Sequence, residues 1–104
     1  MVDKVIRDGK VAVLYSPGFG AGWSTWAYNP EHKEQMVFCP ALVFALEKGE
    51  DLNIVAEALF PDEYHGGLGD LKVFWIPMGE RFRISEYDGS ESIELLDQIS
   101  HYIA

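Results

Sequence analysis

Hydrophobic residues cluster near the start of the chain in two short runs that predict a β-hairpin. Residues 10–16 read Lys-Val-Ala-Val-Leu-Tyr-Ser, a run rich in strand-forming side chains, and a second run covers residues 2–7. Asp8-Gly9 separates the two runs and is a strong signal for a two-residue hairpin turn. We therefore predict antiparallel strands over 2–7 and 10–16, ended by Pro17-Gly18.

The middle of the chain changes to helical spacing and predicts three short helices. Residues 29–31, Asn-Pro-Glu, are typical of a helix start, because Asn can cap, Pro suits the first helical position and Glu favours the positive end of the helix dipole. Pro40 ends this helix and can open a second one over 40–48. A third helix is expected over 52–60, with Asp51 as its N-cap.

Two further strands are expected after a glycine-rich connector at 65–70. Residues 71–77 are apolar almost without interruption, a pattern typical of a strand that is central in its sheet. Residues 81–87 alternate, with Phe82 and Ile84 on one face and polar side chains on the other. This alternation predicts an antiparallel partner with one face open to solvent.

The C-terminal residues are compatible with two structures. Asp88-Gly89 is a second turn signal, and a strand over 92–96 followed by a short terminal segment at 101–104 is the preferred interpretation. A helix is the alternative, because apolar residues also recur there at helical spacing. Those residues are Ile93, Leu96, Ile99 and Ile103.

The predicted order of strands, then helices, then strands indicates an α+β fold. We expect a single domain over 1–104, since no linker or repeat divides the chain. Its antiparallel or mixed sheet would have about four or five strands, with two or three short helices packed on one face.

Composition and charge narrow the class of protein. The 104 residues include 17 acidic and 8 basic side chains, a net charge of −9, and from Ile84 onward there is no Lys or Arg. Such a surface repels nucleic acid and anionic membranes, so neither is expected as a direct partner. It could attract a basic protein surface through Glu91 and Glu94, or it could serve solubility alone.

The cysteine count and the N-terminal residues bear on the compartment. Cys39 is the single cysteine, so it cannot form an internal disulfide, and its apolar surroundings favour a buried, inert thiol. Residues 1–4 do not resemble the basic start of a signal peptide. The apolar stretch at 36–46 is interrupted by Pro40 and is too short to cross a bilayer. We therefore expect a cytoplasmic protein.

A glycine- and tryptophan-rich segment at 16–26 is the main candidate for a binding site. Its glycines can hold a turn whose N–H groups point at an anion. However, their spacing matches neither the dinucleotide-binding pattern nor the Walker loop, and no cation lies nearby. A ligand with a flat ring fits better, because aromatic side chains can stack on it while hydroxyls and amides hold its polar edge. Packing of both tryptophans into the core is an equally good account. The candidate residues are Gly18, Phe19, Gly20, Gly22, Trp23, Ser24, Thr25 and Trp26.

A second cluster, at 86–92, is dense in acidic and hydroxyl side chains. Glu86 and Asp88 share a strand face if the strand continues, where they could share a proton or accept a ligand's hydroxyl groups. An acidic surface hairpin is the simpler interpretation. The spacing fits neither a calcium loop nor a glycosidase pair, and the scattered histidines match no metal-ligand pattern. We therefore expect no metal and no cofactor, and an enzyme is the less favoured class.

Two motifs stand out as a pair. Residues 17–26 read Pro-Gly-Phe-Gly-Ala-Gly-Trp-Ser-Thr-Trp, and residues 82–93 read Phe-Arg-Ile-Ser-Glu-Tyr-Asp-Gly-Ser-Glu-Ser-Ile. With the helix start at 29–31, the chain resembles a group of small proteins encoded by tailed bacteriophages and prophages, less closely over 49–70. The resemblance implies an accessory protein acting in a bacterial cytoplasm against host machinery or defence. It assigns no catalytic residue.

Three hypotheses of function follow. The first is a non-enzymatic protein that binds a small molecule, for example a nucleotide-like one, between the glycine–tryptophan segment and the Glu86–Asp88 edge. The second is an acidic inhibitor that docks on a basic host protein through Glu91 and Glu94 and so imitates nucleic acid. The third is a small hydrolase that uses Glu86 or Asp88 as its base. A homodimer through an edge strand or a helix face is compatible with each of them.

Overall fold

The computed structural model describes residues 2–18, 22–63 and 65–95 of the chain and confirms the α+β class. The described strands form two antiparallel sheets, one of three strands and one of two, rather than a single sheet. Phe19 and Gly20 lie outside the described residues, as does the expected terminal segment at 101–104.

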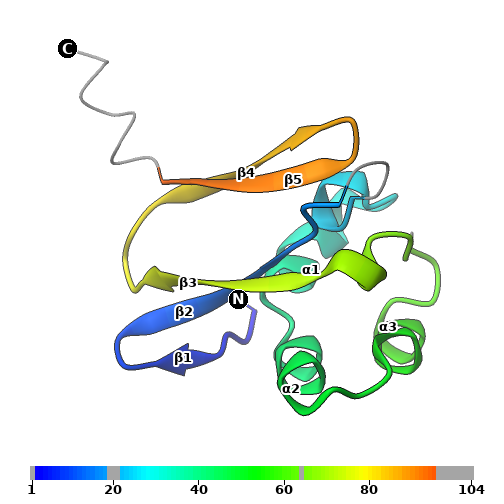
Figure 1. The fold of residues 1–104 in the computed structure, drawn as a ribbon, viewed down its shortest axis with the longest axis horizontal. Coiled ribbons are helices and arrows are strands. Elements are labelled where there is room, and N and C mark those ends of the chain that lie inside the picture. Colours follow the sequence, from blue (N-terminus) through cyan, green and yellow to red (C-terminus); the bar gives the residue numbers. More distant parts are fainter. Residues whose placement is uncertain (1, 19–21, 64, 96–104) are drawn as a thin grey trace.

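The elements follow one another in the order predicted from the sequence. The chain begins with strands β1 and β2, continues through helices α1, α2 and α3, and ends with strands β3, β4 and β5 (Figure 1). Short 3₁₀ helices occur at Ser24–Trp26, Pro30–His32 and Leu68–Asp70. The bounds are β1 Ile6–Arg7, β2 Lys10–Tyr15, α1 Lys33–Phe38, α2 Pro40–Lys48, α3 Leu52–Leu59, β3 Lys72–Pro77, β4 Phe82–Tyr87 and β5 Ser90–Leu95.

Both predicted Asp-Gly turns close β-hairpins. Asp8 and Gly9 have φ angles of 51° and 76°, and Asp88 and Gly89 have φ angles of 53° and 87°. Positive φ at both central residues is the requirement of the turn that matches the twist of two paired strands, and Asp-Gly meets it at low cost. The first turn joins β1 to β2 and the second joins β4 to β5. The strand interpretation of the C-terminal residues is therefore confirmed as far as Leu95.

The expectation that residues 71–77 form a central strand is wrong. Within the described residues β3 pairs with β2 alone, and β4 pairs with β5 instead of β3. Side chains on both faces of β3 make apolar contacts: Trp75 packs against the helices and Ile76 against the β4–β5 hairpin, while Phe74 is 38% exposed. Pro77 suits the open edge, because the N–H of the next residue, Met78, is the one that points inward to Gly9.

The sheet β1–β2–β3 separates two apolar clusters. Ala12 and Leu14 face the first cluster, with α2 and α3, while Val11 and Val13 face the second, with the β4–β5 hairpin. Helix α1 contributes to both clusters, through Met36 to the first and Phe38 to the second. In Figure 1 the hairpin lies along the top of the view and α2 and α3 lie at the lower right. Helices α2 and α3 therefore cover one face of the sheet, the hairpin covers the other, and α1 contacts both clusters.

Local signals place the helix ends where the sequence predicts them. Gly49 takes the left-handed conformation, with φ 71°, and ends α2. The Asp51 side chain accepts a hydrogen bond from the N–H of Asn53, at 2.9 Å, and caps α3. Asn29 precedes the helical residues as expected but makes no side-chain cap. None of the described helices is long and apolar enough to cross a membrane.

Gly67 marks a close approach of two backbone segments and provides a test of the fold. A Cβ atom at Gly67 would lie 2.2 Å from the carbonyl oxygen of Gly22, whereas a Cβ atom at Gly69 would meet nothing within 4 Å. We expect Gly67→Ala to lower the free energy of unfolding by about 1–3 kcal/mol, the usual cost of overpacking. Gly69→Ala is the matched control. Urea denaturation of both variants checks this, and equal stabilities would show that the two segments do not meet as described.

Candidate functional site

The glycine–tryptophan segment is tied down by a buried carboxylate from β5. Glu91 is 1% exposed. Its Oε1 accepts the N–H of Ser16 at 2.9 Å, and its Oε2 accepts the N–H groups of Trp23 at 2.8 Å and Thr25 at 3.0 Å. The Thr25 hydroxyl donates to the same Oε2. The N–H of Glu91 in turn donates to the Ser16 carbonyl at 2.8 Å. A buried carboxyl group is tolerated here because these hydrogen bonds replace its hydration.

The expectation that Glu91 belongs to an acidic docking surface is wrong, because its side chain is inside the protein. The alternation along β5 carried a signal for this placement. Glu91 occupies the same strand face as Ile93 and Leu95, and both of those side chains pack against the second apolar cluster. A carboxylate on a face that otherwise points inward requires internal hydrogen-bond donors.

The two tryptophans of the segment have different surroundings. Trp23 is fully buried, its indole N–H donates to the Met36 carbonyl at 2.8 Å, and its ring packs edge-on against Phe60, 6.3 Å between centroids. It therefore presents no face to a ligand. Trp26 is half-buried, and its ring lies so close to Gly22 that a Cβ atom there would meet it at 2.7 Å. The sequence did not decide between core and pocket, and Trp23 belongs to the core.

Gly18 serves close packing as well. A Cβ atom at this position would lie 2.0 Å from a carboxylate oxygen of Asp70. The glycines at 18 and 67 thus allow the segment to pack against residues 65–70, and Gly22 makes room for the Trp26 ring within the segment. This packing accounts for the three glycines without any ligand.

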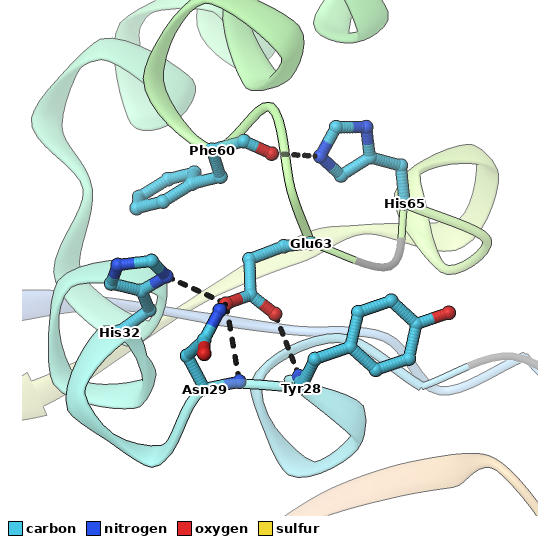
Figure 2. Close-up of polar contacts among 6 residues, drawn as sticks. All are labelled: Tyr28, Asn29, His32, Phe60, Glu63 and His65. Carbon is cyan, nitrogen blue, oxygen red and sulfur yellow. Dashed lines mark hydrogen bonds and ion pairs between the residues drawn. The ribbon is translucent and has the colours of Figure 1, made fainter.

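A second buried carboxylate, Glu63, holds the residues that follow the glycine–tryptophan segment (Figure 2). Its Oε1 accepts the N–H of Tyr28 at 2.6 Å, and its Oε2 accepts the N–H and the side-chain amide of Asn29, at 3.2 and 2.8 Å. The Nδ1 atom of His32 lies 2.6 Å from the same Oε2. Burial by itself raises the pKa of Glu63, but the hydrogen bonds from Asn29, His32 and Tyr28 outweigh it, so the pKa lies below its ordinary value.

Sequence reasoning did not find Glu63. It stands after Pro61 in a polar stretch that ends α3, and nothing in that pattern separates it from an exposed acid such as its neighbour Asp62. Its partner Asn29 was expected to cap a helix with its side chain, and that side chain binds Glu63 instead. The pairing depends on tertiary packing, which local sequence does not encode.

The other acidic candidates lie at the surface. Glu86 and Asp88 are exposed at the β4–β5 turn, where the Glu86 carboxylate accepts the N–H of Gly89 at 2.6 Å. Glu94 is partly exposed and accepts hydrogen bonds from Ser85 and Arg83, which hold its pKa below the ordinary value. The turn does approach the glycine–tryptophan segment, because the Ser90 hydroxyl donates to the Pro17 carbonyl at 2.7 Å.

A groove of about 370 Å³ lies beside the segment, between the 3₁₀ helix Ser24–Trp26, α1 and β4. Most of its apolar wall is buried or half-buried, and its two charged residues are exposed. The lining residues are Ser24, Thr25, Lys33, Glu34, Val37, Phe38, Phe82 and Ile84. Two of the predicted site residues, Ser24 and Thr25, thus line a concave surface, whereas Glu86 and Asp88 do not line it.

A larger hollow, of about 470 Å³, is lined by other residues, among them Gln35, Cys39 and Phe60. Burial raises the pKa of the Cys39 thiol there, as expected for an unreactive cysteine.

Within the described ranges, no group of three or more His, Cys, Asp or Glu side chains is placed to hold a metal ion. Comparisons with protein-family models, with curated proteins and with solved structures find no match.

The lowered pKa of Glu63 predicts a loss of stability in acid. A carboxyl group whose pKa is lower in the folded than in the unfolded state stabilises the fold above its unfolded pKa, and this contribution is lost as the pH falls through the folded pKa. We expect the wild-type free energy of unfolding to fall as the pH is lowered from about 5 to about 3, and Glu63→Gln to flatten this dependence.

Chemical denaturation at a series of pH values measures this effect. Glu57→Gln, an exposed change on α3, is the matched control and is expected to keep the wild-type slope. If Glu63→Gln and Glu57→Gln show the same pH dependence, Glu63 does not hold Tyr28, Asn29 and His32 through its charged form.

Proposed function

We propose that this protein is a non-enzymatic binding protein whose ligand is a small molecule with a flat apolar ring and a hydrogen-bonding edge. The observation that carries the proposal is the groove beside Thr25. Phe38, Phe82 and Ile84 offer apolar contact to a ring, and Lys33 and Glu34 bring charges. Ser24 and Thr25 line the polar side of the groove, where the Thr25 hydroxyl donates to Glu91 and keeps its oxygen as an acceptor. A largely apolar hollow with a few polar groups is the usual form of a small-molecule site.

Three features of the site support one class of ligand over others. Trp23 offers no stacking surface, and the N–H groups of Ser16, Trp23 and Thr25 are already engaged by Glu91. Among the described residues, Lys33 is the one cationic side chain that lines the groove, and the chain has a net charge of −9. These features favour a nucleobase or nucleoside over a phosphorylated nucleotide. The resemblance to phage proteins implies that the protein would bind this ligand inside a bacterial host cell.

The two alternative functions gain less support. A hydrolase using Glu86 or Asp88 needs a carboxylate withdrawn from solvent, and both side chains are exposed. An acidic inhibitor of a host protein would have to use surface acids, and Glu91 is buried while Glu94 is engaged by Arg83. The groove is therefore the feature on which the proposal rests.

An NMR titration of the labelled protein tests the proposal with free bases, nucleosides and nucleoside monophosphates. We expect the bases and nucleosides to shift the amide signals of Thr25, Val37 and Ile84, because these residues line the groove. Val37→Arg places a long side chain in the groove and should weaken binding about tenfold or more, equivalent to roughly 1.4 kcal/mol.

The control variant is Ile54→Arg, on α3, where the native side chain is 70% exposed and lies outside the groove. It should bind like the wild type, and thermal unfolding of both variants confirms that they are folded. The proposal fails if no compound of the panel shifts the groove amides, or if binding survives Val37→Arg unchanged.

A further inference from the structure

The hydrogen bonds around the Glu91 carboxylate resemble those between a bound anion and the protein that binds it. Its carboxylate joins donors that stand 75, 68 and 66 positions away in the chain: the N–H groups of Ser16, Trp23 and Thr25. The Thr25 hydroxyl adds a fourth donor. Each of these donors is neutral, so the carboxylate is held by converging hydrogen bonds, as anions are in backbone N–H concavities.

The donors are held in place by contacts other than Glu91. Ser16 is fully buried directly after β2, and the Trp23 side chain is fixed by the Met36 carbonyl. The 3₁₀ turn that carries Thr25 is closed by its own backbone bond, from the N–H of Trp26 to the Trp23 carbonyl at 3.2 Å. None of these contacts involves the Glu91 side chain.

One further polar atom at this place has no partner. The Ser16 hydroxyl is buried and makes no hydrogen bond in the described structure, although the N–H of the same residue binds Glu91. Unpartnered buried hydroxyls are uncommon. The Ser16 hydroxyl is therefore a further hydrogen-bonding group on a residue whose N–H already binds one oxygen of the carboxylate.

The hairpin that carries Glu91 is attached to the rest of the domain in two ways. Its apolar face, with Phe82, Ile84 and Ile93, packs against the second cluster. Its polar attachment is the Glu91 carboxylate, supported by the bond from the Glu91 N–H to the Ser16 carbonyl and by Ser90 on Pro17. Removal of the carboxylate alone leaves the apolar attachment in place.

We propose that Ser16, Trp23 and Thr25 form a carboxylate-binding site, that Glu91 is its tethered ligand, and that docking of the β4–β5 hairpin is a binding event within one chain. Free carboxylates of matching size, such as formate and acetate, bind this site when the Glu91 side chain is shortened. The inference concerns a different set of contacts from the groove and does not depend on the proposed ligand.

Thermal unfolding of Glu91→Ala with added sodium formate or sodium acetate tests the proposal. The variant loses stability, because buried N–H groups are left without an acceptor. Formate and acetate should then raise its Tm in a saturable way, by about 5 °C at concentrations well above Kd, relative to sodium chloride of equal ionic strength. The amide signals of Ser16, Trp23 and Thr25 should shift in the same titration.

Two controls separate a site from a general salt effect. Glu91→Gln fills the space with a neutral amide and should show no formate response beyond that in chloride. Glu86→Ala removes an exposed acid from the same hairpin and should also show none. If Glu91→Ala is unfolded in chloride, formate should restore the folded signal. A variant that stays unfolded in formate, or whose Tm follows ionic strength alone, overturns the proposal.

Discussion

A carboxylate withdrawn from water must find hydrogen-bond donors, and backbone N–H groups outside helices and strands must find acceptors. In this protein the two kinds of group meet between Ser16 and His32, where the described residues form two short 3₁₀ helices joined by irregular backbone. Glu91 and Glu63 accept hydrogen bonds from five backbone N–H groups of this region. The two carboxylates therefore accept backbone hydrogen bonds in this region, as carbonyl groups of paired strands do elsewhere in the fold.

This arrangement determines what the glycine–tryptophan segment can do. Its glycines allow close packing, Trp23 is part of the core, and Glu91 accepts hydrogen bonds from its N–H groups. The described part of the segment is therefore packed against the rest of the domain. Ser24 and Thr25 belong to this part and line the groove together with α1 and β4. Glu91 joins β5 to Thr25, and the shape of the groove thus depends on the same carboxylate.

The sequence predicted the elements well because their signals are local. The Asp-Gly turns, Pro40 and Gly49 fix strand and helix ends through backbone geometry alone, and α2 occupies the predicted range 40–48. Prediction from the sequence failed where contacts between distant segments determine the structure. An apolar run such as 71–77 indicates apolar contacts on both faces of a strand and does not indicate how many strands flank it.

The candidate site was predictable only in part, for the same reason. The sequence located the segment that carries Ser24 and Thr25, but it did not place Glu91 inside the protein or reveal Glu63. Native-state hydrogen exchange of the amides of Ser16, Trp23, Thr25, Tyr28 and Asn29 tests the central role of the two carboxylates most directly. We expect these amides to be protected comparably to the amides paired between β2 and β3. Exchange at the rate of an exposed loop, with the strands protected, would contradict this expectation.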